Sequence, residues 1–258
     1  MTPFVPLSIP AAALVIGAGI AVSAFPAHSD GDHAIHQKDA VASPAGEKIT
    51  ASFDILAAHV HREGRTVTFH MTTRGTAGSD KPDRTGALGG ASVYAYVWPT
   101  SLDPSAVGFE GGTGILALAA TSHPDFDDTP FFDENGDGDP ANDGDLWHSH
   151  WVVLHPNEAC GPGALGVRDI PEGSRPAMPA TWPGLPLFID SPGYTPLFDG
   201  PEVRVTVPFA DPDSVAGASY DGVTSALRVN ANIHAPLLCV TDVFDIASGD
   251  LSLPGKVK

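Results

Sequence analysis

The sequence predicts an all-β protein, an antiparallel β-sandwich or barrel with long loops rich in proline and glycine and with little helix. Three observations support this prediction. Glycine (28) and proline (25) make up just over a fifth of the 258 residues, which is typical of chains rich in turns. Apolar residues recur mainly at every second position, in short segments. No segment shows convincing helical periodicity.

The charge balance limits the possible partners. The chain has 31 acidic and 13 basic residues, which gives a net charge of −18. Nucleic acids and anionic membrane surfaces are bound by clustered lysine and arginine, so we expect neither partner for the mature protein. An acidic excess instead suits solubility and the binding of cations.

Residues 1–24 are predicted to be a signal peptide. Residues 11–24 form an unbroken run of small and apolar residues, and Val22-Ser23-Ala24 offers the small side chains that a signal peptidase needs. A membrane anchor is the alternative, because no Lys or Arg precedes the run. The run is short for a spanning helix and no basic flank follows it, so we expect export to a periplasmic or extracellular location.

The remaining chain is divided by composition. Residues 25–48 are polar and predict a flexible leader, residues 49–253 predict a single β-sandwich domain, and residues 254–258 predict a short tail.

The domain is predicted to begin with a β-hairpin. Residues 49–61 are extended, residues 65–72 alternate, and Glu63-Gly64 is the predicted turn. A two-residue loop there places His59 opposite Thr68. It also places three histidines on one face of the sheet: His59, His61 and His70. The other face carries the apolar residues and is the predicted core face.

Further strands are predicted from short alternating or apolar segments. They cover residues 91–98, 114–122, 146–155, 202–208, 225–233 and 237–246. Residues 156–200 contain nine prolines and seven glycines, which predicts a long irregular region. Such a loop inside a compact domain often has a function.

The two cysteines, Cys160 and Cys239, are predicted to form a disulfide in an oxidising compartment. The bond would close a long loop and contribute about 2–4 kcal/mol. A pair of thiolate metal ligands is the alternative, but the chain lacks a C-x-x-C motif.

An acidic loop over residues 133–145 resembles the calcium loop of an EF-hand across about a dozen residues. Its first acidic positions and the glycine that follows them match, but Gly144 stands where the EF-hand has a bidentate glutamate. The carboxylates beside Gly144 are expected to replace it. The predicted Ca²⁺ ligands are Asp133, Asn135, Asp137, Asp139, Asp143 and Asp145. Just upstream, Asp125, Asp127 and Asp128 can complete this site or form a second one. A solvated acidic loop is the alternative.

Two His-x-His pairs predict a transition-metal site. Residues two apart on a strand face the same way, so each pair can bind one ion. Neutral imidazole suits Zn²⁺ and Cu²⁺. The predicted ligands are His59, His61, His148 and His150, with His70 as a further member, and the spare candidates are His123, His155 and His234. The alternative is that these histidines are ordinary half-buried polar residues.

These residues are compatible with three different functions. The first is an exported metal-binding protein with structural Ca²⁺ and a site for Cu²⁺ or Zn²⁺. The second is a metalloenzyme with an open coordination position. The third is a calcium-stabilised module that binds a carbohydrate or protein partner through its four tryptophans, although core packing is expected for at least two of them. No G-x-S-x-G, phosphate-loop or dinucleotide motif occurs, so the sequence does not decide whether the protein is an enzyme.

Overall fold

The computed structural model of the chain describes residues 40–232 and 236–258. The predicted signal peptide, most of the predicted leader and the spare candidate His234 lie outside the described residues. Within these residues the protein is all-β, with antiparallel sheets, as predicted. The helices among the described residues are 3₁₀ turns of three or four residues, at Pro104–Val107, Glu158–Cys160 and Pro212–Val215.

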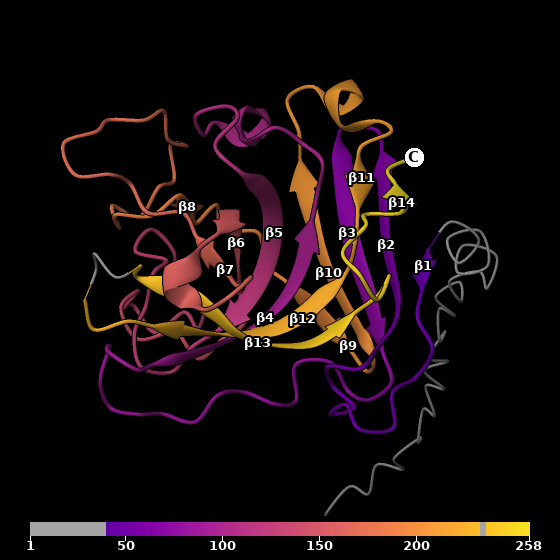
Figure 1. Cartoon of the computed structure of the whole chain (residues 1–258), viewed down its shortest axis with the longest axis horizontal. Helices are drawn as coiled ribbons and strands as arrows, with labels where there is room; N and C mark the ends of the chain where they lie inside the picture. The colour runs from indigo at the N-terminus through magenta and orange to yellow at the C-terminus, as the bar shows by residue number, and fades with distance from the viewer. Residues whose placement is uncertain (1–39, 233–235) are drawn as a thin grey trace, which may run out of the picture.

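Six strands close into a barrel (Figure 1). Their order around the barrel is β5 (Ile115–Ser122), β4 (Ser92–Pro99), β12 (Val223–Val229), β13 (Leu238–Ile246), β7 (Leu165–Val167) and β6 (His148–Pro156). Pairing of β6 with β5 completes the closure, and β8 (Ile189–Asp190) adds to the free side of β6.

A five-stranded sheet stands beside the barrel, on the right in Figure 1. Its order is β1 (Val41–Ala42), β2 (Ile55–Glu63), β3 (Thr66–Thr73), β10 (Glu202–Pro208) and β9 (Leu197–Asp199). A separate pair, β11 (Ser219–Tyr220) and β14 (Gly255–Lys256), brings the C-terminal segment against the preceding chain. Strand β1 lies within the predicted leader, so ordered structure begins earlier than residue 49.

The first hairpin turns one residue later than predicted. Glu63 pairs with Thr66, so the two loop residues are Gly64 and Arg65. Gly64 has φ of 58°, a left-handed conformation that glycine adopts without steric cost. Moving the turn by one residue moves the register by two, so His59 lies opposite His70 instead of Thr68. A shift of two keeps every side chain on its predicted face.

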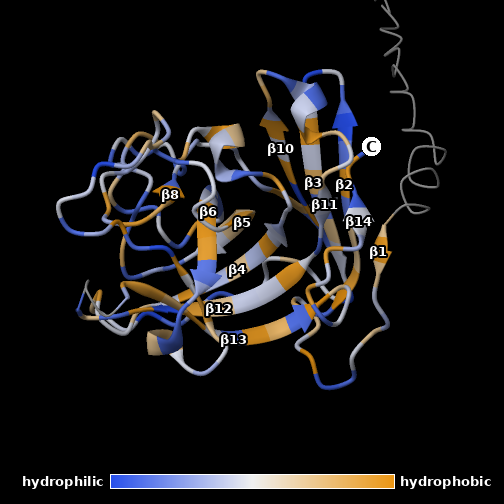
Figure 2. Ribbon diagram, turned by 45° about the horizontal axis from the view of Figure 1, so that its top comes forward, coloured by the Kyte–Doolittle hydropathy of each residue, from blue (hydrophilic) through white to orange (hydrophobic). Residues whose placement is uncertain are grey.

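Alternation on the barrel strands creates two hydrophobic cores. Outward-facing Trp98 and Trp151 pack against Phe69 of the five-stranded sheet, with ring centroids 6.1 Å and 5.6 Å from it. Inward-facing residues such as Ala119 and Val152 line the barrel interior. Hydrophobic segments accordingly lie on strands of both sheets (Figure 2). Strands β4, β5 and β6 are therefore buried on both faces along most of their length, which explains their many apolar residues.

The predicted disulfide is present. Cys160 and Cys239 are bonded, with Cα atoms 5.4 Å apart and a sequence separation of 79 residues. The bond links the 3₁₀ turn before β7 to the start of β13. The predicted irregular region 156–200 also contains the short strands β7, β8 and β9.

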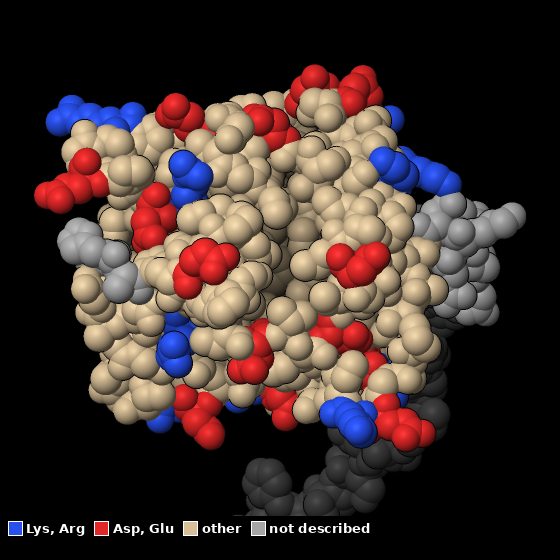
Figure 3. All heavy atoms as spheres, viewed as in Figure 1, with Lys and Arg blue, Asp and Glu red and all other residues tan. Residues whose placement is uncertain are grey.

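Charged side chains are interspersed on the face that Figure 3 shows. Acidic groups outnumber basic ones, and Lys and Arg form no continuous patch on this face. No helix among the described residues has the length and apolar composition that crossing a membrane requires.

Candidate metal centre

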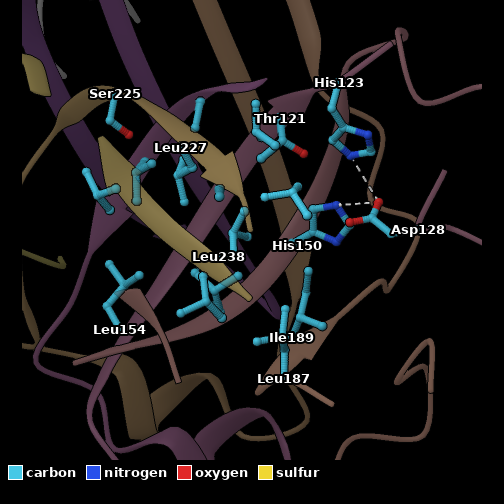
Figure 4. A pocket seen from close by; sticks show the side chains of 18 of the residues that line it. Thr121, His123, Asp128, His150, Leu154, Leu187, Ile189, Ser225, Leu227 and Leu238 are labelled. Atoms are coloured by element: carbon cyan, nitrogen blue, oxygen red, sulfur yellow. Dashed lines mark ion pairs between the residues drawn. The ribbon is translucent and has the colours of Figure 1, made fainter. Parts of the chain in front are cut away.

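Four side chains gather at the end of the barrel where β5 stops and β6 starts. His123 directly follows β5, and His148 is the first residue of β6, paired with Thr121. Alternation along β6 sends His148 and His150 to the barrel interior, while Trp151 faces the sheet. Asp128 comes from the long loop that joins the two strands. Figure 4 shows His123, Asp128 and His150 together at one side of the barrel interior.

The four side chains converge on one point. The Oδ1 atom of Asp128 lies 3.2 Å from Nε2 of His123, 3.2 Å from Nε2 of His148 and 3.1 Å from Nε2 of His150. One ligand atom from each residue lies within 4.8 Å of all the others. All four residues are buried.

The opposite ring nitrogens fix the protonation of two histidines. Nδ1 of His123 lies 2.9 Å from the carbonyl oxygen of Phe126, and Nδ1 of His148 lies 2.8 Å from that of Leu146. A carbonyl only accepts hydrogen bonds, so each Nδ1 carries a proton and donates it. In the neutral ring Nε2 then presents a lone pair. The two Nε2 atoms are 2.9 Å apart, and lone pairs at that distance repel unless a proton or a metal ion lies between them.

The third histidine is oriented in a similar way. Nδ1 of His150 lies 3.3 Å from the carbonyl oxygen of Asp190 and 3.1 Å from the hydroxyl of Ser191. The Ser191 hydroxyl also donates to the carbonyl oxygen of Asp128, at 2.7 Å. Partners on the outer ring nitrogen are the usual means by which proteins orient metal-binding histidines.

The electrostatics favour an ionised carboxylate among imidazoles. Burial alone would raise the pKa of Asp128, but the histidines around it hold that pKa well below its ordinary value. Burial alone would lower the pKa of His123, but Asp128 raises it overall. Burial lowers the pKa of His148 to about 4, and the charges of the neighbouring histidines act in the same direction. His148 is therefore a neutral imidazole at neutral pH, as metal binding requires.

Gly144 holds the connecting loop against the site. Its carbonyl oxygen accepts a hydrogen bond from the His123 amide at 2.6 Å. A Cβ atom on Gly144 would lie 1.8 Å from the Phe126 carbonyl oxygen and 2.6 Å from that of His123. Only glycine allows this approach, so the residue that breaks the EF-hand pattern is explained by backbone packing.

A second group consists of three carboxylates beside the first. Asp127, Glu134 and Asp143 offer ligand atoms within 4.8 Å of one another. The Asp143 amide donates to Asp127 at 3.0 Å, and the Glu134 amide donates to Asp143 at 2.9 Å. Oδ1 of Asp143 is buried and has no hydrogen-bond partner. Burial raises the pKa of Glu134, and the charges of Asp127 and Asp143 raise it further.

The predicted histidine ligands fall into two separate sets. His148 and His150 belong to the four-residue cluster. His59, His61 and His70 lie on β2 and β3 and belong to neither ligand group found among the described residues. The rings of His59 and His61 stack with centroids 5.0 Å apart, and His70 pairs with Glu202. The predicted combination of His59, His61 and His70 with His148 and His150 is therefore not brought together.

The predicted calcium ligands are mostly engaged with their own loop. Asp133 accepts hydrogen bonds from the amides of Gly136, Asp137 and Gly138, at 2.7–3.1 Å. The amide of Asp139 bonds to Asp137. Of the six predicted ligands, Asp143 alone belongs to a carboxylate group found among the described residues. Calcium binding by residues 133–145 stays a prediction.

Two members of the cluster had weaker signals in the sequence. In the sequence, His123 is only a spare candidate ligand, and Asp128 is one of three aspartates upstream of the acidic loop. The position of His123, directly after one predicted strand and before the strand that contains His148, was the available signal. Consecutive antiparallel strands place the end of one beside the start of the next.

The donor set itself indicates the class of ion. Three imidazole nitrogens and one carboxylate oxygen suit first-row transition ions and Zn²⁺, whereas Ca²⁺ and Mg²⁺ prefer oxygen alone. Comparisons with protein-family models, with curated proteins and with solved structures found no match to this chain.

Proposed function

We propose that this chain is an exported transition-metal-binding protein whose ligands are His123, Asp128, His148 and His150. The convergence of three Nε2 atoms on one buried carboxylate oxygen is the observation that supports the proposal. Zn²⁺ or Cu²⁺ is the expected ion, because both accept imidazole and carboxylate ligands. The disulfide and the apolar N-terminal segment support export.

A metalloenzyme is the second candidate, and one observation favours it. His123, Asp128 and His150 also line a cavity in the barrel interior, so a molecule in that cavity can reach the ion. Tetrahedral zinc sites can take up a fifth ligand, which would be the substrate. The carbohydrate-binding alternative has less support, because Trp98 and Trp151 are fully buried in the core and cannot stack on a sugar.

We also propose a structural Ca²⁺ ion held by Asp127, Glu134 and Asp143. Three carboxylates so close together repel one another without a cation, and Asp143 contributes a buried oxygen with no hydrogen-bond partner. Backbone carbonyls and water would complete the coordination shell. Calcium titration of Asp143→Asn and of Asp133→Asn separates this site from the EF-hand-like loop. Loss of binding in Asp133→Asn alone would favour the loop.

Metal analysis of tag-free protein tests the main proposal. After equilibration with Zn²⁺ and removal of free ion, we expect about one zinc per chain. His123→Ala should lower the zinc affinity by more than about 100-fold, since loss of a mere supporting residue already costs 10–100-fold. His155→Ala is the matched control, because His155 lies on the same strand outside the cluster. Unchanged zinc binding in His123→Ala would refute the assignment.

A further inference from the structure

The barrel surrounds a partly open cavity of about 240 Å³ beside the proposed metal centre. Aliphatic side chains from the inner faces of the strands form most of its wall, among them Val97, Val152, Leu154 and Leu227. Figure 4 shows Leu154, Leu227 and Leu238 to the left of His123, Asp128 and His150, while Leu187 and Ile189 lie below His150. The cavity therefore has a long apolar part and one polar end.

The cavity is large for a protein interior. Cores are packed about as densely as organic crystals, and voids larger than a water molecule are few. A leucine-lined cavity of about 150 Å³ is enough to hold benzene. Small residues face this interior at Ala95 and Ala119, where larger side chains would fill the space. An apolar molecule of moderate size therefore fits the barrel.

A buried hydroxyl lies at the polar end. Thr121 faces the cavity from β5, and Figure 4 shows it on the side of the cavity where His123 and His150 lie. Its Oγ1 atom is buried and has no hydrogen-bond partner. Buried hydroxyls nearly always have a partner, because leaving one unpaired carries a desolvation penalty. A polar atom of a bound molecule would supply the missing partner.

The charge of the centre selects the head group. One carboxylate and three neutral imidazoles around a divalent cation leave a net charge of +1 on the ion and its own ligands. Asp127 also lines the cavity, but it belongs to the neighbouring carboxylate group, where the proposed Ca²⁺ would balance two of the three negative charges. A monoanionic oxygen ligand would neutralise this charge, and buried charges require such pairing.

From these features we infer that the barrel cavity binds a small aliphatic molecule with a carboxylate head group. The carboxylate binds the ion and accepts a hydrogen bond from Thr121, and the alkyl chain occupies the apolar part of the cavity. This inference rests on the proposed metal centre and names the class of molecule that the centre would hold.

Cobalt-substituted protein provides the test, because the visible spectrum of Co²⁺ responds to its ligands. Octanoate is the probe, acetate tests the need for the alkyl chain, and octanol tests the need for the carboxylate. We expect octanoate to change the cobalt spectrum and to bind more than about 100-fold more tightly than acetate, since every buried methylene adds to the affinity. Octanol should leave the spectrum unchanged.

Variants locate the bound molecule. Thr121→Val should weaken octanoate binding by about fivefold, the effect of one hydrogen bond, without changing the cobalt affinity. Ser225→Ala is the matched control, because Ser225 lines the same cavity away from the histidines (Figure 4). Leu154→Phe adds volume at the apolar end and should weaken the binding of octanoate but not that of acetate. Ala95→Phe should act in the same way if Leu154→Phe does not fold.

The outcomes separate the two proposals. If added Co²⁺ gives no ligand-field spectrum, the metal centre itself is refuted, and the carboxylate inference with it. If the spectrum forms but octanoate does not change it, or if acetate binds as tightly as octanoate, only the cavity inference is refuted.

Discussion

Two His-x-His pairs lie on strands of this protein, and they have different surroundings. His148 and His150 lie on the inner face of β6 and meet His123 and Asp128 at the end of the barrel. His59 and His61 lie on β2 of the five-stranded sheet, on the face opposite its apolar core residues, with His70 across from His59. The motif and the strand geometry are the same in both places.

The difference comes from what covers each pair. The loop between β5 and β6 folds over the end of the barrel and brings Asp128 to His148 and His150. Partners on the outer nitrogens then aim three Nε2 atoms at Asp128. On β3, by contrast, His70 pairs with Glu202 of the neighbouring strand. A His-x-His pair thus specifies a shared face, and the covering loop determines whether that face becomes a metal site.

Replacing each pair in turn gives the largest expected effect. His148→Ala with His150→Ala should lower the Zn²⁺ affinity by more than about 100-fold, because two of four ligands are lost. His59→Ala with His61→Ala should leave the affinity unchanged. Competition with a chromophoric chelator measures both, and circular dichroism confirms that the variants are folded. A loss of affinity in the His59 and His61 variant would show that the two pairs cooperate.

Zinc binding to the site that contains His148 and His150 should also raise the free energy of unfolding, without any contribution from His59 and His61. An ion that binds only the folded state adds about 2.7 kcal/mol to the free energy of unfolding when its concentration is 100 times the dissociation constant. We expect this stabilisation in the wild type and in the His59 and His61 variant, and its loss in the His148 and His150 variant. Urea unfolding with and without Zn²⁺ measures it. Equal stabilisation of all three proteins would place the ion elsewhere.

The covering loop can be perturbed without touching a ligand. Gly144→Ala should lower the zinc affinity by about 10–100-fold, because the new methyl group displaces the carbonyl of Phe126 that orients His123. Overpacking should also cost about 1–3 kcal/mol of stability. Gly136→Ala is the control for zinc affinity, because no atom lies within 4 Å of the Cβ position there, and its φ of 74° should make alanine cost about 1–2 kcal/mol of stability as well. A normal zinc affinity in Gly144→Ala would mean that the loop does not orient the ligands.

The smallest expected effect concerns Glu202, which pairs with His70 beside His59 and His61. Burial alone would raise the pKa of Glu202, but its contacts with His70 and Thr72 lower it below the ordinary value. The stabilisation from the ionised carboxylate is therefore complete above the unfolded pKa of about 4.3 and is lost as the pH falls through the lower folded value. Glu202→Gln should flatten the dependence of stability on pH below about pH 5, by less than about 1 kcal/mol. If the free energy of unfolding depends on pH in the same way in the wild type and in Glu202→Gln, this prediction is wrong.

Much of the fold could be predicted because alternation is a local signal. The predicted strands at residues 91–98, 114–122 and 202–208 match β4, β5 and β10 within one or two residues. Closure into a barrel could not be predicted, because a sandwich and a barrel have the same alternation of inward and outward residues. The hairpin register was missed because two turn positions one residue apart place the same residues on the same faces.

The site was less predictable than the fold, for a physical reason. The shared face of His148 and His150 follows from the period of a strand. Asp128 reaches them only because the loop adopts one conformation, which depends on the close approach at Gly144 and on the Ser191 hydroxyl, 63 residues away from Asp128 in sequence. Contacts of that kind leave no periodic pattern in a single sequence.

The barrel is joined unevenly around its circumference. Strand β7 has three residues, and it pairs with β13 through a single residue pair, Gly166 and Cys239. The disulfide crosses this same seam, because Cys160 lies just before β7. Elsewhere in the barrel a ladder of hydrogen bonds joins neighbouring strands, but between β7 and β13 the disulfide supplements a single residue pair. We therefore expect oxidation of the two cysteines to be a step in maturation. In a chain with reduced thiols, β7 and β13 can separate, and the barrel cavity then loses part of its wall.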